Sequence, residues 1–442
     1  DDEADHGTGL AGLAAYGDLT DALSSAEPIK ISNRLESVKL VPAEGANEGD
    51  ARHHAYLFTE GVSRPEISAP NRQRVFTSAV TASDYRGRPS SWSAAVDGLA
   101  ADTAGAAESP RLFVLSAGNT RDPDAWVRYP ESLSTNLVHD PGQAWNAITV
   151  GACTDKVDTE GHASLNPVAE AGGLSPFTTT TRTWDRAWPL KPEVVLEGGN
   201  AAKDNLGAVG MPSLNLLTTH NQPLNRLFTT SNATSAASAL CAGMAAQIMA
   251  AYPHLRPETV RALLVHSAQW SDSMRGMFLP ADRMPNKGDY VHLIRHCGWG
   301  TPDLNRALWS AGDSLTLLVE DQVHPYAKVP GKGVVTRDMN LHSLPWPKDE
   351  LEALQDTPVE MRVTLSYFIE PNPSARGVAS KYHYPSHRLR FDVQRPLDAS
   401  TDNFVARVNA AAQREDEGDP VNPSDPNRLL GELQRHRGSL HQ

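Results

Sequence analysis

Ser235 has the surroundings that nucleophilic chemistry requires. It follows a turn of small residues and opens an apolar stretch that runs to Ala251, which predicts a buried helix. The first turn of a helix carries unpaired backbone N–H groups and the positive end of the helix dipole. Such groups stabilise the oxyanion that forms when a serine attacks a carbonyl. A serine that only caps a core helix has the same surroundings, so Ser235 alone does not decide between the two roles.

A base and an oxyanion donor stand elsewhere in the chain. His6 opens the run His-Gly-Thr-Gly, and Asn119 ends the run Leu-Phe-Val-Leu-Ser-Ala-Gly-Asn, which predicts a buried strand and a tight turn. An imidazole can take the proton of a serine hydroxyl, and a side-chain amide can donate to an oxyanion. In the order His, Asn, Ser, the sequence therefore supplies three groups that acyl transfer uses.

The three motifs together resemble those of the subtilisin-like serine proteases, the subtilase family. In that family the histidine lies in a His-Gly-Thr motif that opens a helix, the asparagine follows a strand, and the serine lies in Gly-Thr-Ser before the central helix. The resemblance extends over residues 1–312. Further similar segments lie at 147–152, 190–195, 253–267 and 298–308.

The resemblance implies a serine endopeptidase that acts through an acyl-enzyme. Ser235 would be the nucleophile, His6 the base, and Asn119 the oxyanion donor. The expected substrate is a protein or peptide. An extended peptide would pair with the strand segment that holds Ser78, Ala79 and Val80.

The chain departs from the family pattern at four places. Ala233 stands where the family has glycine, Ala239 where it has proline, and Gly9 where it has a second histidine. None of these changes removes a catalytic atom, although alanine tolerates fewer backbone conformations than glycine. The fourth departure is the triad acid, because the family's Asp-x-Gly motif lies a few tens of residues before the histidine and only five residues precede His6.

Because no Asp-x-Gly motif precedes His6 in this sequence, several hypotheses about the triad acid stay open. The chain has no initiating methionine and begins within the motif, so we expect a fragment whose Asp-x-Gly segment lies upstream. Carboxylates close to His6 could provide a diffuse substitute: Asp1, Asp2, Glu3 and Asp5. The alternative function is a catalytically impaired, subtilase-like pseudoprotease that acts as a protein-binding module. A third hypothesis is an α/β protein in which the three motifs coincide by chance.

Strand and helix patterns alternate through the first 312 residues. This order predicts a parallel sheet with helices on both faces, the subtilisin-like α/β arrangement, with catalytic loops at the carboxyl ends of the strands. We expect strands at 37–41, 75–80, 112–116 and 147–152, and helices at 7–17 and 90–101. The polar segments 47–70 and 154–186 predict an insertion and loop-rich surface.

The pattern changes after residue 312. Alternating β-rich runs between Pro-rich turns predict a small antiparallel β domain of sandwich type over 313–395. Residues 404–413 predict a helix, and the acidic, proline-containing stretch 414–426 predicts a linker. We therefore divide the chain into a catalytic domain at 1–312, a β domain at 313–395, and a helix with an acidic tail at 396–442.

Composition excludes several function classes. The formal net charge of −13 argues against a nucleic-acid partner, which usually needs a basic face. Three scattered cysteines are too few for a disulfide framework. No apolar run is expected to span a bilayer and no signal peptide is visible, so we expect no membrane partner and a cytoplasmic location. The sequence carries no signal of the oligomeric state.

Three short motifs suggest other functions. Residues 7–12 match the Gly-x-Gly-x-x-Gly of dinucleotide-binding loops, but an acidic segment precedes them where a strand is required. His292 and His296 lie one helical turn apart, but zinc would need further ligands. The glycosylation sequon at Asn232 is interpreted as chance, since a glycan there would block Ser235. We therefore assign no cofactor and no metal.

Overall fold

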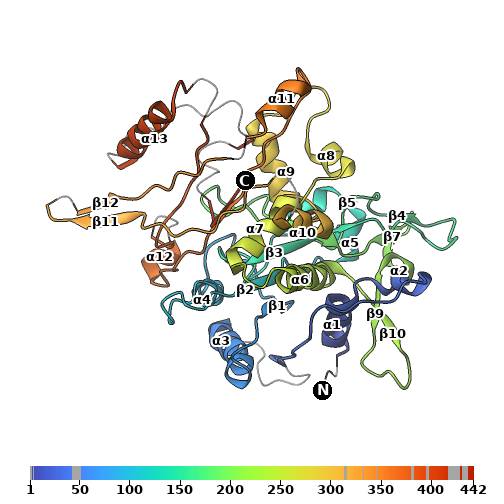
Figure 1. The fold of residues 1–442 in the computed structure, drawn as a ribbon. Helices are drawn as coiled ribbons and strands as arrows, with labels where there is room; N and C mark the ends of the chain where they lie inside the picture. Colours follow the sequence, from blue (N-terminus) through green and yellow to red (C-terminus); the bar gives the residue numbers. More distant parts are fainter. Residues whose placement is uncertain are drawn as a thin grey trace.

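A parallel β-sheet forms the centre of the protein, and helices cover both of its faces (Figure 1). The computed structural model describes residues 2, 4–41, 51–312, 316–331, 333–344, 346–379, 383–394, 398–416, 429–430 and 437–442. The parallel strands, in their order across the sheet, are β1 (Val75–Ser78), β2 (Leu112–Ser116), β3 (Ile148–Thr154) and β6 (Val194–Glu197). The short β5 (Gly173–Leu174) pairs antiparallel with β3. This arrangement confirms the predicted α/β class.

Helices and small antiparallel pairings surround this sheet. The helices before residue 313 are α1 (His6–Tyr16), α2 (Leu19–Ser24), α3 (Ala51–Ser68), α4 (Ser91–Ala100), α5 (Pro123–Val127), α6 (Ala233–Ala251), α7 (Pro257–Ser267), α8 (Asp272–Phe278), α9 (Lys287–Cys297) and α10 (Leu304–Gly312), with 3-10 turns at Glu131–Ser134 and Pro212–Leu214. Strand β7 (Ala201–Lys203) pairs with β4 (Asn166–Pro167) and β8 (Ala208–Gly210), and β9 (Leu216–Thr219) pairs with β10 (Phe228–Ser231). The β9–β10 hairpin leads directly into α6.

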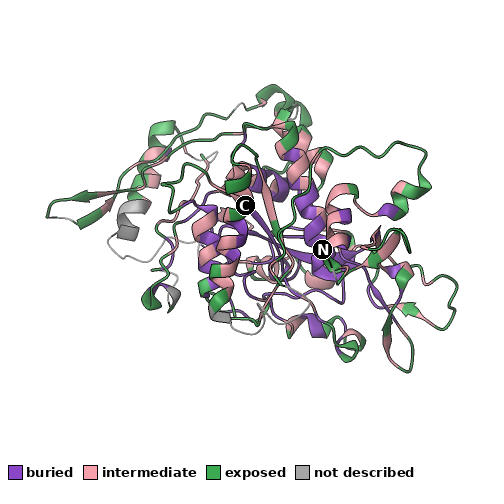
Figure 2. Cartoon of the chain, turned by 90° about the horizontal axis from the view of Figure 1, so that it is seen from below, coloured by how far each residue is buried: buried purple, intermediate pink, exposed green. Residues whose placement is uncertain are grey.

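The side chains of β2 alternate between two layers of helices. Leu112 and Val114 pack in the cluster that contains α6 and α7. Phe113 and Leu115 point the other way and pack with residues of α3 and α4. Every residue of β2 and β3 is buried, as expected for parallel strands covered on both faces. In Figure 2 the buried residues accordingly gather in the sheet and the helices beside it.

Helix α6 lies against the sheet and contacts four of its parallel strands as well as α1, α7 and α10. Its 19 residues give it the length and composition of a membrane-crossing helix, the one such helix in the described ranges, whereas the sequence analysis expected none. However, 67% of that apolar window is buried inside the protein. A helix that is apolar all round is typical of a buried core position, and α6 occupies one.

Buried polar groups fix the turn that enters β3. The Asp97 carboxylate accepts hydrogen bonds from the backbone N–H groups of Trp145 (3.1 Å) and Asn146 (2.8 Å). Burial raises the pKa of Asp97 to about 6 although these bonds oppose the shift. The Lys191 ammonium donates to the Ala147 carbonyl oxygen at 3.0 Å and pairs with Glu193 at 2.5 Å. These contacts hold the 145–147 turn from both sides.

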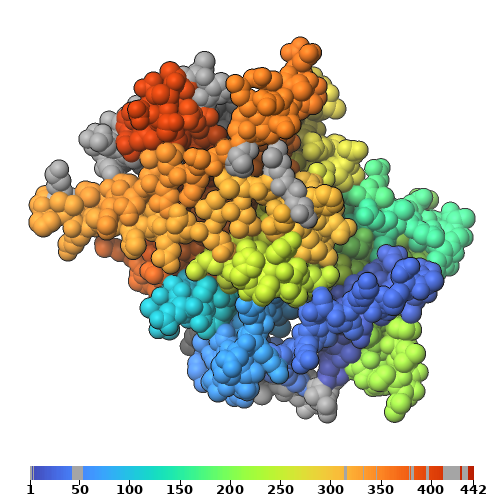
Figure 3. All heavy atoms as spheres, viewed as in Figure 1, coloured from blue at the N-terminus to red at the C-terminus, as the bar shows by residue number. Residues whose placement is uncertain are grey.

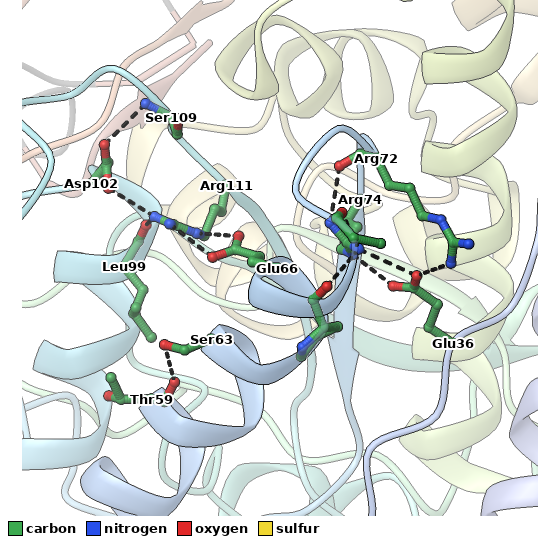
Figure 4. Close-up of polar contacts among 12 residues, drawn as sticks. Glu36, Thr59, Ser63, Glu66, Arg72, Arg74, Leu99, Asp102, Ser109 and Arg111 are labelled. Carbon is green, nitrogen blue, oxygen red and sulfur yellow. Dashed lines mark hydrogen bonds and ion pairs between the residues drawn. The ribbon is translucent and has the colours of Figure 1, made fainter.

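Part of the predicted polar insertion at 47–70 is the helix α3, which was not expected from the sequence. Residues 51–68 form this helix, which buries Phe58 and Val62 at i, i+4 spacing against α4, and residues 42–50 lie outside the described ranges. The Arg74 guanidinium anchors the helix by donating to the carbonyl oxygens of Pro65 and Ala69, both at 2.8 Å. Arg111 binds Glu66 on α3 and Asp102 beyond α4 (Figure 4). The helix was missed because its apolar residues are few among charged ones and glycine.

The expected strand at 37–41 is also wrong. Residues 37–41 form neither helix nor paired strand in the described chain, and most of them are exposed. Glu36, just before them, binds Arg72 and Arg74 (Figure 4). Residues with β-forming side chains do not make a strand without a hydrogen-bonded neighbour.

Small antiparallel sheets follow residue 312, which agrees with the predicted fold class. Beyond this point the elements are β11 (Tyr326–Val329), β12 (Gly333–Thr336), α11 (Lys348–Leu354), β13 (Leu365–Ser366), α12 (Ala375–Ala379), α13 (Thr401–Asp416) and β14 (Leu440–His441). Strand β11 pairs with β12 in a hairpin that is largely exposed (Figure 2), and β13 pairs with β14. Most of the predicted linker and acidic tail lies outside the described residues. The division into three domains stays a prediction.

The C-terminal segments pack on the α/β region through Arg261 of α7. This guanidinium is fully buried and donates to the carbonyl oxygens of Trp145 (3.1 Å), Tyr367 (2.7 Å) and Ser439 (2.6 Å). Desolvation lowers the pKa of Arg261 to about 10, so the side chain stays charged at neutral pH. A buried cation with several acceptors therefore joins the ends of β13 and β14 to the turn before β3.

Candidate functional site

Ser235 lies in the first turn of α6, as predicted. The helix begins at Ala233, and Ser235 has 3% of its surface exposed. Its hydroxyl makes no hydrogen bond within the described part of the chain, whereas its carbonyl oxygen accepts from the Ser238 hydroxyl at 2.8 Å. The hydroxyl thus lies at a helix N-terminus and has no structural hydrogen-bond partner among the described residues.

Asn119 and the residue before Ser235 are joined by hydrogen bonds. Asn119 Oδ1 accepts from the Thr234 backbone N–H at 3.0 Å and from the Thr234 hydroxyl at 2.6 Å. The Gly118 backbone N–H donates to the same hydroxyl oxygen at 3.1 Å. Because Oδ1 faces Thr234, the Asn119 NH₂ group points its donors elsewhere, and it has no acceptor among the described residues. The structure thus brings the end of β2 and the start of α6 together.

We call the contact between Asn119, Thr234 and Ser235 the corner. The contribution of Thr234 to it was not predicted from the sequence. Its side chain and backbone both orient the Asn119 amide, and it is fully buried. The available signal was its place directly before Ser235. Sequence order could not show which way its hydroxyl points.

His6 opens α1, which packs against α6 and the β9–β10 hairpin. Figure 3 shows the N-terminal residues in dark blue beside the light-green hairpin. The imidazole reaches solvent, and neither ring nitrogen hydrogen-bonds to a described residue. Partial desolvation and the nearby Arg121 lower the pKa of His6, while Asp2 opposes the shift. No hydrogen bond joins His6 to Ser235 within the described ranges.

The carboxylates near His6 have other partners. Asp2 accepts from the Thr8 backbone N–H at 2.6 Å, so it caps the first turn of α1. Although burial acts to raise it, the hydrogen bonds from Thr8 and Ala4 hold the pKa of Asp2 below its usual value. Asp5 accepts from the Asn221 backbone N–H at 2.7 Å on the hairpin. Asp1 and Glu3 lie outside the described residues.

Ser78, Ala79 and Val80 lie at and beyond the carboxyl end of β1. Ser78 and Ala79 are half-buried and Val80 is exposed. In the described chain β1 pairs with β2 alone and forms an edge of the sheet. Backbone groups at such an edge can pair with a further extended segment.

The comparison with known families agrees with these observations. The model of the subtilase family matches residues 1–300, which is more than half of the chain. The chain belongs to the subtilase family. It is also 31% identical, over 281 residues, to the uncharacterized protein y4bN of Sinorhizobium fredii (strain NBRC 101917 / NGR234). The match covers 58% of this chain and 58% of that relative, so the chain spans little more than half of the relative's length.

Ala233 shows what the departure from the family's glycine does to this subtilase. Its φ of +63° lies in the left-handed region, which an alanine enters at a steric cost. The Ala233 backbone N–H donates to the Gly198 carbonyl oxygen at 2.6 Å, which fixes the turn before Ser235. The turn before Ser235 therefore adopts a left-handed conformation at Ala233 despite its Cβ.

The histidine pair of this subtilase is an aromatic stack. The rings of His292 and His296 lie 4.6 Å apart, and Phe278 stacks on His296 at 4.3 Å. Burial lowers the pKa of His296 to about 3, although its bond to the His292 carbonyl oxygen opposes the shift, so the ring is neutral. Within the described residues no three His, Cys, Asp or Glu side chains are grouped as metal ligands.

Proposed function

We propose that this chain is the catalytic region of a serine endopeptidase in which Ser235 attacks the peptide carbonyl. The observation that supports this most is the bonding of Asn119 to Thr234, because it sets an amide beside an uncommitted serine hydroxyl at a helix N-terminus. The Asn119 NH₂ group and the Ser235 backbone N–H would donate to the oxyanion of the tetrahedral intermediate.

In this mechanism His6 carries the proton. It takes the proton of the Ser235 hydroxyl during attack and returns it to the leaving amine, after which water releases the acyl group by the same route. The substrate backbone pairs with Ser78 to Val80 at the edge of β1. In the resting geometry His6 makes no hydrogen bond to Ser235, so substrate binding would have to bring the two together, as catalytic hydrogen bonds often tighten only in the complex.

The proposed mechanism lacks a described carboxylate that hydrogen-bonds to His6 and could act as the triad acid. Without a carboxylate on the second ring nitrogen, the imidazole is free to adopt the wrong tautomer and carries the proton less stably. Loss of such a carboxylate typically costs about 10⁴ in kcat. We therefore propose that the chain as it stands is a slow catalyst. The same observation supports the second candidate, a pseudoprotease that binds peptides without cleaving them.

Hydrolysis of casein and of fluorogenic peptides tests the proposal. We expect slow cleavage that Ser235→Ala removes, while Ser164→Ala, on an exposed loop, cleaves like the unchanged chain. Cleavage that survives in Ser235→Ala would refute the assignment. Saturable peptide binding without any cleavage, in a folded chain, would favour the pseudoprotease.

A further inference from the structure

Residues 181–189 form a loop of turns that a buried arginine of α9 holds in place. Arg295 has 4% of its surface exposed, and its guanidinium donates to the Thr181 carbonyl oxygen at 2.6 Å. Longer contacts of 3.4 Å reach the carbonyl oxygens of Trp184 and Asp185. The Thr181 backbone N–H donates in return to the Arg295 carbonyl oxygen at 2.9 Å. The acceptors of this guanidinium are neutral, and no described carboxylate forms an ion pair with it.

Two exposed arginines lie on the same loop. Neither Arg182 nor Arg186 forms an ion pair or a side-chain hydrogen bond with a described residue. The single carboxylate of the loop, Asp185, accepts from the Ala187 backbone N–H at 2.7 Å. The backbone N–H groups of Thr183, Asp185 and Arg186 have no acceptor in the described ranges. The loop therefore combines side-chain and backbone donors that no described group of the protein satisfies.

A second buried arginine lies beside this loop. Arg437 has 6% of its surface exposed, and the next residue, Gly438, packs on Pro189 at the end of the loop. A Cβ on Gly438 would lie 3.4 Å from Pro189 Cβ. After burial, the charge of Arg437 is the largest influence that lowers the pKa of Arg295. Two buried cations are therefore close neighbours under the loop.

The exposed arginines also act on the buried one. The pKa of Arg295 is about 10, lowered first by burial and then by like charges that include Arg182 and Arg186, while Asp185 opposes the shift. Burial and then Arg182 lower the pKa of His292 on the same helix. Like charges this close repel, and a bound anion would relieve the repulsion. This local excess of positive charge occurs in a chain with a formal net charge of −13.

We propose that the loop 181–189 and Arg295 form a binding site for a phosphoryl group, which Arg182 and Arg186 contact directly. Ser235 has no part in the site, so the inference does not rest on the proposed function. A phosphoryl group carries a charge of about −1.5 to −2 at neutral pH and three acceptor oxygens. It therefore accepts from two guanidinium groups and from backbone N–H groups at once. A carboxylate has one charge and two oxygens, and it satisfies fewer of these donors.

Calorimetric titration at constant ionic strength tests the inference. The probes are inorganic phosphate and a short phosphoserine peptide, which share this chemistry. The titrations use Ser235→Ala as the parent protein, so that peptide cleavage contributes no heat. We expect saturable binding of at least one probe. Arg182→Gln and Arg186→Gln should each weaken it roughly 10-fold, the effect of losing one charge-assisted hydrogen bond.

Arg226→Gln is the matched control, because it removes an exposed positive charge from the loop between β9 and β10. It should leave binding unaltered, and thermal melting confirms that each variant is folded. Tighter binding of the phosphoserine peptide than of inorganic phosphate would support the site and indicate a phosphorylated protein as its ligand. The reverse order would support the site and indicate a small phosphate compound.

Three results would overturn the inference. The first is that the folded protein binds neither probe saturably. The second is that all three glutamine variants weaken binding equally, because that reports net charge and not a site. The third is that a peptide with aspartate in place of phosphoserine binds as tightly, because the site would then recognise carboxylates. None of these results bears on the assignment of Ser235 as the nucleophile.

Discussion

In this subtilase, the corner that holds Ser235, the proposed nucleophile, and the base arm that holds His6, the proposed base, are built in different ways. The corner joins the end of a fully buried strand to the first turn of a buried helix, and the hydrogen bonds between Asn119 and Thr234 close it. The base arm is an N-terminal helix whose histidine reaches solvent. Its described carboxylates, Asp2 and Asp5, bind backbone N–H groups of Thr8 and Asn221.

This difference shows which half of the site the fold itself determines. The corner is formed by contacts that the core requires in any case, so its geometry follows from folding. The base arm needs an orienting partner that packing of the described residues does not supply. A corner with these contacts is therefore compatible both with a slow enzyme and with a peptide-binding protein, and we expect the base arm to decide between them.

The largest effect that we predict concerns Asn119. If its amide donates to the oxyanion, Asn119→Ala should lower kcat by roughly 10² to 10³ and leave KM nearly unchanged, because the bond forms only in the transition state. Steady-state kinetics on one fluorogenic peptide measures this. A raised KM with an unaltered kcat would instead assign Asn119 to substrate binding.

Thr234→Val tests whether the Thr234 hydroxyl orients the Asn119 amide. The substitution keeps the shape but removes the hydroxyl that holds Asn119 Oδ1, so we expect a roughly 10-fold loss of kcat, equivalent to one hydrogen bond. Thr230→Val, on the exposed side of β10, is the matched control. Equal rates in the two variants would show that the backbone contact alone orients Asn119.

Asp2→Ala tests whether Asp2 serves only to cap α1 or also acts as the acid for His6. Since Asp2 caps α1, its loss should cost about 1 kcal/mol of stability, measured as a lower unfolding midpoint in urea. The rate per folded molecule should change little, because the Asp2 carboxylate does not hydrogen-bond to His6. A large fall in kcat without a fall in stability would make Asp2 the acid that the site requires.

Ala233→Gly tests the turn in front of Ser235. Glycine adopts a positive φ without steric cost, but it also gains entropy in the unfolded chain. We expect a net stabilisation of about 0.5 kcal/mol, small enough to need denaturant melts of both proteins side by side. A destabilised variant would mean that the Ala233 methyl group contributes more by packing than it costs in strain.

The smallest predicted effect is on the pH profile. The pKa of His6 is lowered, so the neutral base persists below pH 6.5 and activity should fall only as pH drops further. A carboxylate bonded to His6 would raise that pKa and move the acidic limb of kcat/KM above 6.5. The position of this limb therefore reports whether the base has acquired a partner.

The elements that carry Asn119 and Ser235 were predicted better from the sequence than the contacts around His6, for a physical reason. Ser235 and Asn119 each lie at the boundary between a buried element and a tight turn, and such boundaries have local signals. The role of Thr234 depends on a contact across more than a hundred residues, which spacing does not reveal. The partners of Asp2 and Asp5 likewise follow from three-dimensional packing.

Elements whose stability depends on their neighbours were predicted poorly. Residues 37–41 have strand-forming side chains but no strand beside them in the described structure. Helix α3 has few apolar residues and is held by Arg74 and Arg111 from later segments, as Figure 4 shows. Neither outcome is encoded in the local pattern.

The most direct test of the account is to map the site of fluorophosphonate labelling. These probes react with activated serines, so the account predicts a single adduct on Ser235, located by mass spectrometry of tryptic peptides. Ser235→Ala should abolish labelling, and Asn119→Ala should slow it strongly. If Asn119 donates to the oxyanion as proposed, labelling should remain measurable even when peptide turnover is slow. An adduct on another serine, or equal labelling of Ser235→Ala, would contradict the assignment of the nucleophile.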